Sequence, residues 1–511
     1  MKSTERRLVV LSSSDIPDEM EPLVHACEDC ACPASGERIR RTLPVLADES
    51  VIRATSTLEI PVDDEHSALF NPEGNGGVVV VNTTGRELLA RLTEATPIED
   101  LVSAGTEPAV VEEALRTLVA FDIVHPAGRP PAPEFGDSTE LTAWLHVTNK
   151  CNLRCPYCYV HKSDSSMDDD TARKSVDALV TSALRNGFRS LRLKYAGGEA
   201  SLNSDVLLGL HEHARNRCAE AGIGLSAVLL SNGVAIAPRL AADLKRLGIR
   251  VMISLDGLGA AHDAQRPTLG GKPSSARVIR TIERLVAEGL APHISITITS
   301  RNLDGVPDVV RFAVERSLTF SLNFFRDNDC STSFQDLQFE EQAMIDGLTR
   351  AFTVVEERLP RWSLLGSVLD RGQLLSPRRR SCGVGDDYVV VDQYGNLAQC
   401  HMDLSSTVGR IGVDDPVQSI RRAPAGIRNL LAEEKNGCRE CSWRNWCAGG
   451  CSVATFRATG RFDLRSPNCN IYRAIYPQAI RLEGLRILRY ATGTDPSKAV
   501  SIPEADVQTR T

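Results

Sequence analysis

The sequence Thr148-Asn-Lys-Cys151-Asn-Leu-Arg-Cys155-Pro-Tyr-Cys158-Tyr-Val160 brings three thiols together with the spacing C-x3-C-x2-C. Iron–sulfur clusters normally take four cysteine ligands, so three in so short a loop would leave one iron open to a ligand that the protein does not supply. The alternatives are a zinc site or free thiols on a surface loop. Zinc sites generally pair a C-x2-C knuckle with a second pair or with histidine, and neither lies close by in the sequence. The loop therefore predicts an iron–sulfur cluster with one open iron.

Tyr157, directly before the last cysteine, completes a loop that resembles the signature of radical S-adenosylmethionine (radical SAM) enzymes. The resemblance implies that Cys151, Cys155 and Cys158 hold a 4Fe–4S cluster whose open iron chelates the methionine part of SAM. It also implies that one electron from this cluster cleaves SAM to a 5′-deoxyadenosyl radical, and that Tyr157 belongs to the SAM site. An external one-electron donor of the flavodoxin or ferredoxin type would supply the electron.

The composition is that of an ordinary globular protein. At 511 residues the chain is too long for a single core, so about two to four domains are expected. The net charge of −8 gives no broad electrostatic reason to bind nucleic acid or a membrane surface. The apolar run Leu8-Val-Val-Leu11 is too short for a signal peptide, and no long apolar run follows it. We therefore expect a cytoplasmic protein, in which the 15 cysteines stay reduced and serve as metal ligands.

Residues 1–45 have little periodic pattern and are predicted to form a flexible extension. The extension contains His25, Cys27, Cys30 and Cys32. These residues are either the ligands of a zinc ion or exposed thiols on a flexible tail.

A small domain is predicted at 46–126. A predicted strand at 78–81 is followed by three predicted helices. The first covers 84–92, the second begins at the capping box Thr96-Pro-Ile-Glu99, and the third begins after residue 106. A strand at 121–124 ends the series. This order resembles a winged helix, and more specifically the small domain that reads leader peptides in peptide-modifying enzymes. The resemblance implies that an exposed strand edge adds the leader as a further strand. A DNA-binding winged helix would need a basic third helix, whereas this one carries Glu112 and Glu113 beside a single Arg116. A Pro-rich linker at 127–138 ends the domain.

Strands and helices alternate from 139 to 330. The β candidates lie at 144–147, 191–195, 225–230, 249–253, 294–298 and 320–325, with amphipathic helices between them, for example at 170–184, 238–247, 276–288 and 306–315. This repetition implies a parallel sheet. Six units are too few to close an eight-stranded barrel. The predicted fold class is therefore α/β, a partial (β/α)6 barrel that joins the N-terminal winged-helix-like α+β domain to a small C-terminal Cys-rich domain. The chemistry is expected at the C-terminal ends of the strands.

Polar motifs follow the predicted strands in order. They are Gly197-Gly198-Glu199, Ser231-Asn232-Gly233, Ser254-Leu-Asp256-Gly257 with Arg266 further on, and Asn302. In radical SAM enzymes a GGE motif holds the SAM amino group, and corresponding Ser and Arg residues hold the ribose and carboxylate. The resemblance therefore implies SAM contacts from Gly197, Gly198, Glu199, Ser231, Ser254, Arg266 and Asn302. A guanidinium suits a carboxylate because it donates two parallel hydrogen bonds. The family usually continues GGE with Pro, and Ala200 takes that place here.

A bridging segment at 331–375 precedes a second field of cysteines at 376–475. The members of this cysteine field are Cys382, Cys400, Cys438, Cys441, Cys447, Cys451 and Cys469. The first two, with Gly395 between them, form the run C-x12-G-x4-C. Two zinc ribbons would require two C-x2-C knuckles, and Cys438/Cys441 is the only one in this segment. The spacing resembles the auxiliary-cluster domain called SPASM, which is found in radical SAM enzymes that modify peptides and proteins.

The SPASM resemblance implies two auxiliary iron–sulfur clusters, both expected to be 4Fe–4S. Cys438, Cys441, Cys447 and Cys469 would hold the outer cluster, and Cys382, Cys400 and Cys451 would hold the inner one. Two cubanes need eight ligands, and seven are present. The inner cluster then has an open iron, a ligand such as Asp386 or Asp387, or fewer irons. A C-terminal helix and tail at 476–511 follow the domain.

The leading hypothesis is the oxidative maturation of a ribosomally synthesised, leader-bearing peptide, by a thioether or carbon–carbon cross-link, because auxiliary clusters can accept the electron that a substrate radical loses. One rival is an anaerobic sulfatase-type formylglycine-generating enzyme, but those relatives have Asp where His401 follows Cys400. The other is a SPASM dehydrogenase or epimerase for a small molecule, which would not need the domain at 46–126. A non-enzymatic electron carrier would lack the SAM motifs. His401 and Asp327 are the candidate catalytic residues.

Overall fold

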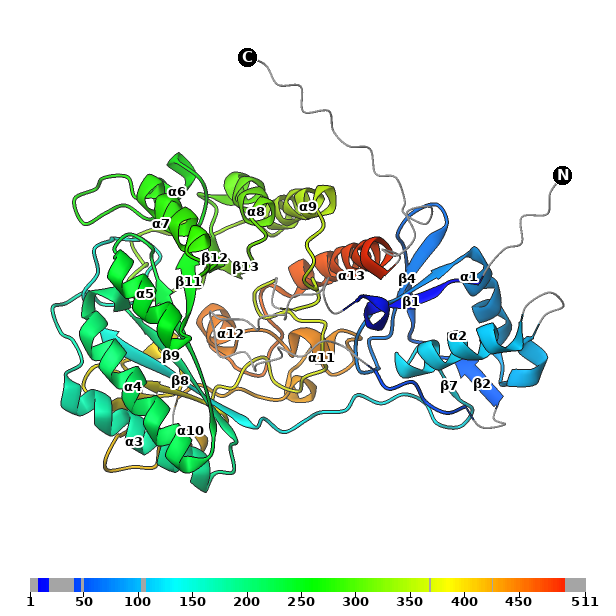
Figure 1. The fold of residues 1–511 in the computed structure, drawn as a ribbon, viewed down its shortest axis with the longest axis horizontal. Coiled ribbons are helices and arrows are strands. Elements are labelled where there is room, and N and C mark those ends of the chain that lie inside the picture. The colour runs from blue at the N-terminus through cyan, green and yellow to red at the C-terminus, as the bar shows by residue number, and fades with distance from the viewer. Residues whose placement is uncertain are drawn as a thin grey trace, which may run out of the picture.

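A computed structural model describes residues 8–17, 41–46, 50–102, 107–366, 369–424 and 426–491. Figure 1 shows the N-terminal elements at one end of the molecule and the alternating strands and helices at the other. Between them lie the C-terminal elements α11 (Arg444–Cys447), α12 (Ser452–Thr459) and α13 (Cys469–Ala491). Within the described ranges, no helix is both long and apolar enough to cross a membrane. The predicted zinc-ligand candidates His25, Cys27, Cys30 and Cys32 lie outside the described residues.

Six parallel strands form the main sheet. They are β8 (Glu140–Thr148), β9 (Ser190–Gly197), β10 (Gly224–Ser231), β11 (Arg250–Ser254), β12 (His293–Ile298) and β13 (Phe320–Phe324). Each strand pairs in parallel with the next one along the chain. This arrangement confirms the predicted α/β class and the parallel order of the six strands.

The second cysteine field extends the same sheet. Strand β14 (Tyr388–Val391) pairs in parallel with β8, and β15 (Asn396–Ala398) and β16 (Thr407–Arg410) add two antiparallel strands, which gives nine strands in all. All four side chains of β14 are buried. The hairpin of β14 and β15 therefore continues the main sheet beyond β8.

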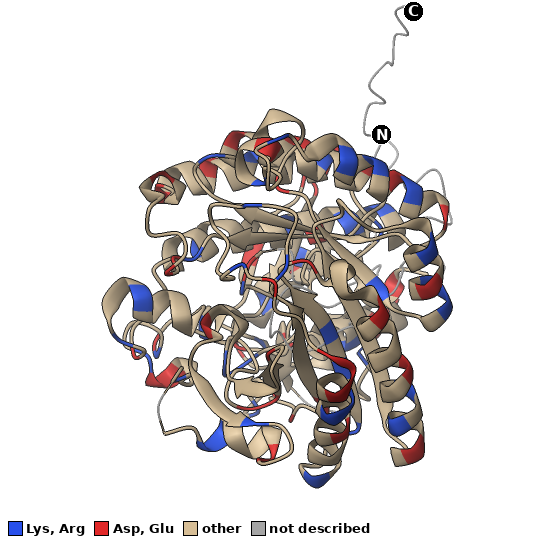
Figure 2. Cartoon of the chain, turned by 90° about the vertical axis from the view of Figure 1, so that its left-hand side faces the viewer, with Lys and Arg blue, Asp and Glu red and all other residues tan. Residues whose placement is uncertain are grey.

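Helices cover the outside of the sheet. They are α3 (Asp169–Arg185), α4 (Ser204–Ala221), α5 (Pro238–Leu247), α6 (Ala260–Gln265), α7 (Ser275–Ala287) and α8 (Val306–Glu315). Local signals set their ends: the Asp168 side chain accepts a hydrogen bond from Thr171 N at the start of α3, and Gly222, with φ +67°, ends α4. In the cartoon of Figure 2, positions of Lys and Arg (blue) and of Asp and Glu (red) are interspersed along the helices.

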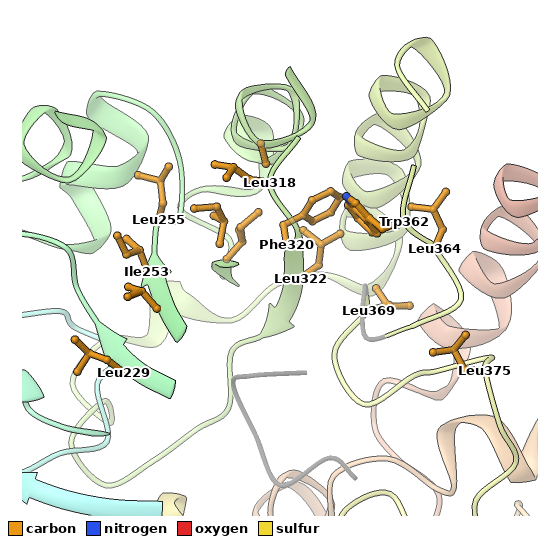
Figure 3. Close-up of a cluster of buried hydrophobic side chains, with 14 of the residues drawn as sticks. Leu229, Ile253, Leu255, Leu318, Phe320, Leu322, Trp362, Leu364, Leu369 and Leu375 are labelled. Atoms are coloured by element: carbon orange, nitrogen blue, oxygen red, sulfur yellow. The ribbon is translucent and has the colours of Figure 1, made fainter. Parts of the chain in front are cut away.

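The main hydrophobic core continues from the barrel into the bridging segment. Figure 3 shows Leu229, Ile253 and Phe320 of the sheet, and beside Phe320 the ring of Trp362 from the bridging segment. The rings of Phe320 and Trp362 meet edge to face, with centroids 5.4 Å apart. The bridging segment, which includes helix α9 (Glu341–Glu357), is therefore a packed part of the core.

The N-terminal unit contains two small sheets and two α-helices in its described residues. One sheet has the order β1-β5-β4-β3, from β1 (Val10–Ser12), β5 (Val79–Asn82), β4 (His66–Phe70) and β3 (Leu58–Pro61). The other has the order β6-β2-β7, from β6 (Thr96–Pro97), β2 (Ser50–Arg53) and β7 (Val124–Pro126). The helices are α1 (Thr83–Ala90) and α2 (Pro108–Ala120).

Two sequence expectations for this unit differ from the structure. Val10–Ser12, in the extension predicted to be flexible, pairs in antiparallel register with β5. The helix predicted from Thr96 is replaced by β6 and a single 3-10 turn at Ile98–Leu101. The hydroxyl of Thr96 donates to the carbonyl oxygens of Arg91 and Glu94 (3.2 and 3.0 Å), so it does not cap a helix, and Thr96 pairs with strand β2.

Helix α13 joins the N-terminal unit to the rest of the molecule. It begins at Cys469, so the boundary predicted at 475/476 falls inside it. A Cβ added at Gly484 would lie 2.9 Å from Val62 Cγ2 and 3.0 Å from Ala68 Cβ, closer than real Cβ contacts. The N-terminal sheet therefore packs directly against the backbone of α13, which places this sheet firmly on the C-terminal helix.

Candidate active site

A cavity of about 220 Å³ lies at the C-terminal ends of the barrel strands. The predicted site residues that line it are Cys151, Cys155, Tyr157, Cys158, Gly197, Gly198, Glu199, Ser231, Ser254, Arg266 and His401. The lining of this cavity does not include Asn302 or Asp327. The strand-end motifs and the cysteine loop, far apart in the sequence, thus meet at one cavity, as expected for a parallel α/β sheet.

The cysteine loop after β8 is held by cations as well as by its backbone. Cys158 N donates to the carbonyl oxygen of Cys155 (3.2 Å), and Lys162 Nζ donates to Cys158 Sγ (2.9 Å). Burial raises the pKa of the Cys155 thiol to about 12, and the neighbouring Arg266 guanidinium acts in the opposite direction. Metal ligation requires the thiolate. The two cations therefore favour the state in which these thiols bind a metal.

The Gly197-Gly198-Glu199 segment lies against the cysteine loop so closely that only glycine fits. A Cβ at Gly197, where φ is +153°, would lie 2.3 Å from Thr148 O, and a Cβ at Gly198 would lie 2.3 Å from Lys150 O. Gly198 N and Glu199 N donate to these same two carbonyl oxygens (2.7 and 2.8 Å). The two segments thus form a narrow cradle beside the three thiols. Ala200, in place of the family's Pro, is fully buried and begins a 3-10 turn.

The carboxylate of Glu199 is fixed by hydrogen bonds. It is 1% exposed and accepts from Ser201 N (3.1 Å), Ser201 Oγ (2.6 Å), Ser231 Oγ (2.8 Å) and Asn232 N (2.7 Å). Ser231, predicted as a SAM contact, therefore also orients Glu199. An anionic group with a fixed orientation at the cavity wall suits an ammonium group as its ligand.

Asp256 connects the cysteine loop to the ends of the fourth and fifth parallel strands, β11 and β12. Its Oδ2 accepts from Arg266 Nε (2.7 Å) and Tyr157 OH (2.5 Å), and its Oδ1 accepts from Thr297 N (2.9 Å). The Arg266 guanidinium lies 5.4 Å from the centre of the Tyr157 ring. Burial opposes the charge of Arg266, but Asp256 outweighs it and raises the arginine pKa further above its ordinary value. Asp256 carries no family signal by itself, and its role follows only from these contacts.

Asn302 and Asp327 have positions other than those expected. Asn302 is buried, and its side-chain amide donates to Asp256 O (2.6 Å) and Thr297 O (2.9 Å). It therefore holds the loops behind the cavity and positions Asp256. Asp327 is exposed, and its carboxylate accepts a hydrogen bond from Gln338.

The rest of the cavity wall is aromatic and cationic. The rings of Trp144 and His401 are stacked with centroids 4.3 Å apart, and His401 Nδ1 lies 2.8 Å from Tyr388 OH. Burial, with Arg371 and Arg326 nearby, lowers the pKa of His401 well below its ordinary value, so the imidazole is neutral at pH 7. Sequence reasoning missed Trp144, which lies in the middle of β8 and stands at the first position of the strand predicted at 144–147, so its place in the chain gave no signal of the cavity.

The cysteines of the second field form two groups. Cys382, Cys400 and Cys451 belong to one buried cluster that also contains Trp144. In the other group, burial raises the pKa of the Cys447 thiol to about 12, and the neighbouring Cys438, Cys469 and Cys441 act in the same direction. No three His, Cys, Asp or Glu side chains among the described residues converge closely enough to hold a single metal ion. In a 4Fe–4S cluster, by contrast, each cysteine binds a different iron.

The two carboxylates considered as further ligands are engaged with other groups. Asp386 forms an ion pair with Arg421 (2.9 Å). Asp387 is buried, which raises its pKa to about 6 against the opposing hydrogen bond from Ser138.

The comparisons with known proteins agree with this geometry. A family model described as the radical SAM superfamily matches residues 145–313. Fe-coproporphyrin III synthase of Methanosarcina barkeri is 27% identical over 366 residues, which cover 65% of this chain and 88% of the relative. PqqA peptide cyclase of Bradyrhizobium diazoefficiens is 22% identical over 378 residues, covering 69% of this chain and 92% of the relative.

A solved structure shares the fold. Native anSMEcpe with bound AdoMet and Cp18Cys peptide superimposes with a TM-score of 0.56 at 19% sequence identity, and the match covers 70% of this chain and 100% of that chain. Residues 145–313 of the present chain therefore form a radical SAM domain, and the chain is an enzyme.

Proposed function

We propose that the chain is a radical SAM peptide maturase that oxidatively modifies a ribosomally synthesised peptide, by a thioether or carbon–carbon cross-link. One observation carries the proposal: a single cavity is lined both by the cysteine loop with its SAM motifs and by Trp144 and His401, which border the cysteines of the second field. The 4Fe–4S cluster with SAM, when bound, supplies a radical that abstracts hydrogen from an unactivated carbon. A substrate in this cavity would lie against the radical source, with the proposed electron acceptor behind Trp144 and His401.

In this proposal the chain holds SAM through groups that are already fixed. Glu199 binds the amino group, Arg266 binds the carboxylate and Ser254 contacts the ribose. Support comes from the hydrogen bonds that orient Glu199 and from the Nε contact that fixes Arg266 on Asp256. A site whose polar groups are oriented before the ligand arrives binds it at a lower entropic cost.

We further propose two auxiliary 4Fe–4S clusters on the two cysteine groups, which would form the SPASM domain. Burial opposes ionisation of Cys451, but Arg326 and Arg371 outweigh it and lower the pKa of this thiol, which favours metal ligation. The contacts of Asp386 with Arg421 and of Asp387 with Ser138 favour an open iron in the inner cluster over a carboxylate ligand. His401, neutral and held between Trp144 and Tyr388, is proposed to orient the substrate and not to act as its general base.

An electron donor of the flavodoxin or ferredoxin type is proposed to reduce the cluster on the cysteine loop.

The N-terminal unit is proposed to bind the leader part of the peptide. The four-stranded sheet has β1 and β3 as its two edges. An edge strand offers unpaired backbone groups to which an extended peptide can add. The likeness of this chain to PqqA peptide cyclase supports a peptide as substrate.

A small molecule is the second candidate substrate. The observation that favours it is the 27% identity to Fe-coproporphyrin III synthase. Formylglycine formation is less well supported, since His401 stands where those relatives have Asp.

The cluster assignment is tested by iron content and by SAM cleavage. Protein reconstituted and reduced under argon should carry about 12 irons, as three cubanes require, and should convert SAM to 5′-deoxyadenosine. The Cys155→Ala variant should lose about four irons and all cleavage, while Cys218→Ala, which changes a buried cysteine outside both fields, should retain both. Continued cleavage by Cys155→Ala would refute the assignment.

The substrate class is tested with the short peptides encoded beside the gene and with coproporphyrin-type tetrapyrroles. Removal of residues 1–126 should weaken peptide affinity while SAM cleavage continues. Unchanged affinity would contradict leader recognition, and conversion of the tetrapyrrole but of no peptide would favour the small-molecule candidate.

A further inference from the structure

A second cavity, also of about 220 Å³, adjoins the active-site cavity. Tyr159, Val160 and Met402 line both, so these residues form the partition between them. The remaining wall of the second cavity comes from the loop after β13, from the turn between β14 and β15 and from the segment after Cys400, together with Asn149, His161 and, from helix α12, Arg457. None of these lining residues is a proposed SAM contact or a cluster ligand.

The wall of the second cavity presents hydrogen-bond acceptors without matching donors. No described residue donates a hydrogen bond to the carboxylate of Asp329, and Asp403 uses only Oδ1, which accepts from Ser406 Oγ (3.0 Å). Gln393 is 7% exposed and donates from Nε2 to Ser165 Oγ (3.1 Å), while its Oε1 accepts from no described residue. A nearly buried amide oxygen and two carboxylates are thus available to one ligand.

The donors on the same wall are already engaged. Arg457 donates from Nη1 to Asp327 O and from Nη2 to Met402 O (3.0 Å). Asn149 Nδ2 donates to Ser163 Oγ (3.1 Å). His161 and Ser405 can donate, but both can also accept.

The net negative charge of the wall also favours a ligand that donates hydrogen bonds. Three carboxylates, those of Asp329, Asp392 and Asp403, stand against the one guanidinium of Arg457. A ligand that matches such a wall is a cation with several N–H donors. A bare metal ion does not match it, since no three carboxylate, thiol or imidazole groups of the described residues converge on one point.

We propose that the second cavity binds a Lys or Arg side chain of the peptide substrate, from a residue next to the one that is modified. This inference rests on the proposed peptide-maturase function and specifies its substrate. In an extended peptide, successive side chains point to opposite sides and follow one another about every 3.3 Å. A peptide that crosses the partition of Tyr159 and Met402 therefore places one side chain in the radical cavity and its neighbour in the second cavity.

Cys330 provides a reporter, because it lines the second cavity, where its thiol donates to Tyr159 O (3.5 Å). Methanethiosulfonate reagents convert a thiolate to a mixed disulfide and release a sulfinate. In the reconstituted enzyme at low salt, the trimethylammonioethyl reagent should label Cys330 faster than the sulfonatoethyl reagent. The rate with the trimethylammonioethyl reagent, divided by the rate with the sulfonatoethyl reagent, should be about tenfold larger for Cys330 than for the free thiol 2-mercaptoethanol. Labelling is followed by the mass of the proteolytic peptide that contains Cys330.

The double variant Asp329→Asn with Asp403→Asn should bring this ratio down to the reference value. The matched control, Asp205→Asn with Asp243→Asn on helices α4 and α5, removes the same charge from the outer surface and should leave the ratio unchanged. A wild-type ratio equal to that of 2-mercaptoethanol would overturn the proposal.

The ligand class is tested by protection. N-acetyl-argininamide should slow the reaction of Cys330 with uncharged methyl methanethiosulfonate, and N-acetyl-citrullinamide, which has the same shape without the charge, should not. Equal protection by both, or by neither, would overturn the proposal. Neither measurement needs turnover. Failure of the enzyme to process any peptide would therefore count against the proposed function and not against the cationic site.

Discussion

Asp387 illustrates how a single buried residue sets a pH dependence. The carboxyl has an ordinary pKa of 3.8, and burial raises this value to about 6 in the folded chain. Between these two values the folded state binds a proton that the unfolded state has released. The stabilising contribution of the protonated carboxyl is therefore full below about pH 4 and is lost as the pH rises through about 6.

The Asp387→Asn variant should remove the free-energy cost of ionising this buried carboxyl, which destabilises the folded state at high pH. Its gain in the free energy of unfolding should be on the order of 2 kcal/mol larger at pH 8 than at pH 4.5, because one unit of pKa shift is worth about 1.4 kcal/mol. Urea unfolding at the two pH values measures the difference. Asp170→Asn, at an exposed ion pair with Lys174 on helix α3, is the control and should show almost none. If Asp387 is instead a cluster ligand, the variant will lose iron, and an iron assay on the same samples distinguishes the two outcomes.

At the residue scale, chemical type and spacing were enough to predict which thiols and which Gly-Gly-Glu segment meet at the cavity. Chemical type and spacing did not predict the role of Asp256, because an aspartate in a Leu-Asp-Gly turn has many uses. Only the fold brings Tyr157, Arg266 and Thr297 to its carboxylate. Asn302 follows a strand as expected, yet its amide hydrogen bonds to backbone carbonyls behind the cavity. The position of a residue in sequence after a strand does not determine the direction of its side chain.

At the scale of elements, the close approach of two loops is the feature that the active site depends on. The loop after β9 lies against the loop after β8, with Gly198 N and Glu199 N hydrogen bonded to carbonyl oxygens of the cysteine loop. Gly198→Ala would place a methyl group 2.3 Å from Lys150 O, so the two loops must separate. We expect 5′-deoxyadenosine formation to fall by about 100-fold, since a displacement of roughly 1 Å has that effect in catalysis.

The matched control for Gly198→Ala is Gly209→Ala. Gly209 lies within helix α4, and a Cβ there would meet no atom within 4 Å. This variant should retain full activity and should gain stability, because alanine favours a helix over glycine by roughly 1 kcal/mol. A rate for Gly198→Ala within about twofold of the wild type would show that the loops tolerate separation.

Elements with a strong repeating pattern were predictable, and elements decided by tertiary contacts were not. The six parallel strands follow from apolar runs at regular intervals. The capping box at Thr96 is a sound local signal for a helix, but pairing with Val51 of strand β2 makes the segment a strand instead. Likewise nothing local in Tyr388–Val391 indicates that it pairs with β8, 240 or more residues earlier in the chain.

At the scale of the whole molecule, the N-terminal unit contacts the cysteine-rich segment directly. The ring of Phe70 lies 4.9 Å from that of Trp446 and 5.9 Å from that of Trp443, between centroids. Trp446 Nε1 donates to Pro72 O (3.0 Å). These two tryptophans lie between two members of the outer cysteine group in sequence, two residues after Cys441 and directly before Cys447. A change at Phe70 of the N-terminal unit would therefore reach the two tryptophans that lie between Cys441 and Cys447.

The contacts of Phe70 with Trp443 and Trp446 lead to a prediction about the proposed outer cluster. Phe70 is fully buried, and Phe70→Ala should cost about 3–5 kcal/mol of unfolding free energy through the cavity that it leaves. Because the cavity would open beside Trp446, the outer cysteines should release their irons to a ferrous chelator faster than in the wild type. SAM cleavage should change little, since the parallel strands β8 to β13 lie at the opposite end of the molecule from the N-terminal unit. Phe456→Ala, at a ring that is 44% exposed and stacked on Phe462, is the control and should release iron at the wild-type rate. Unchanged iron release from a destabilised Phe70→Ala would mean that the N-terminal unit and the outer cluster are energetically independent.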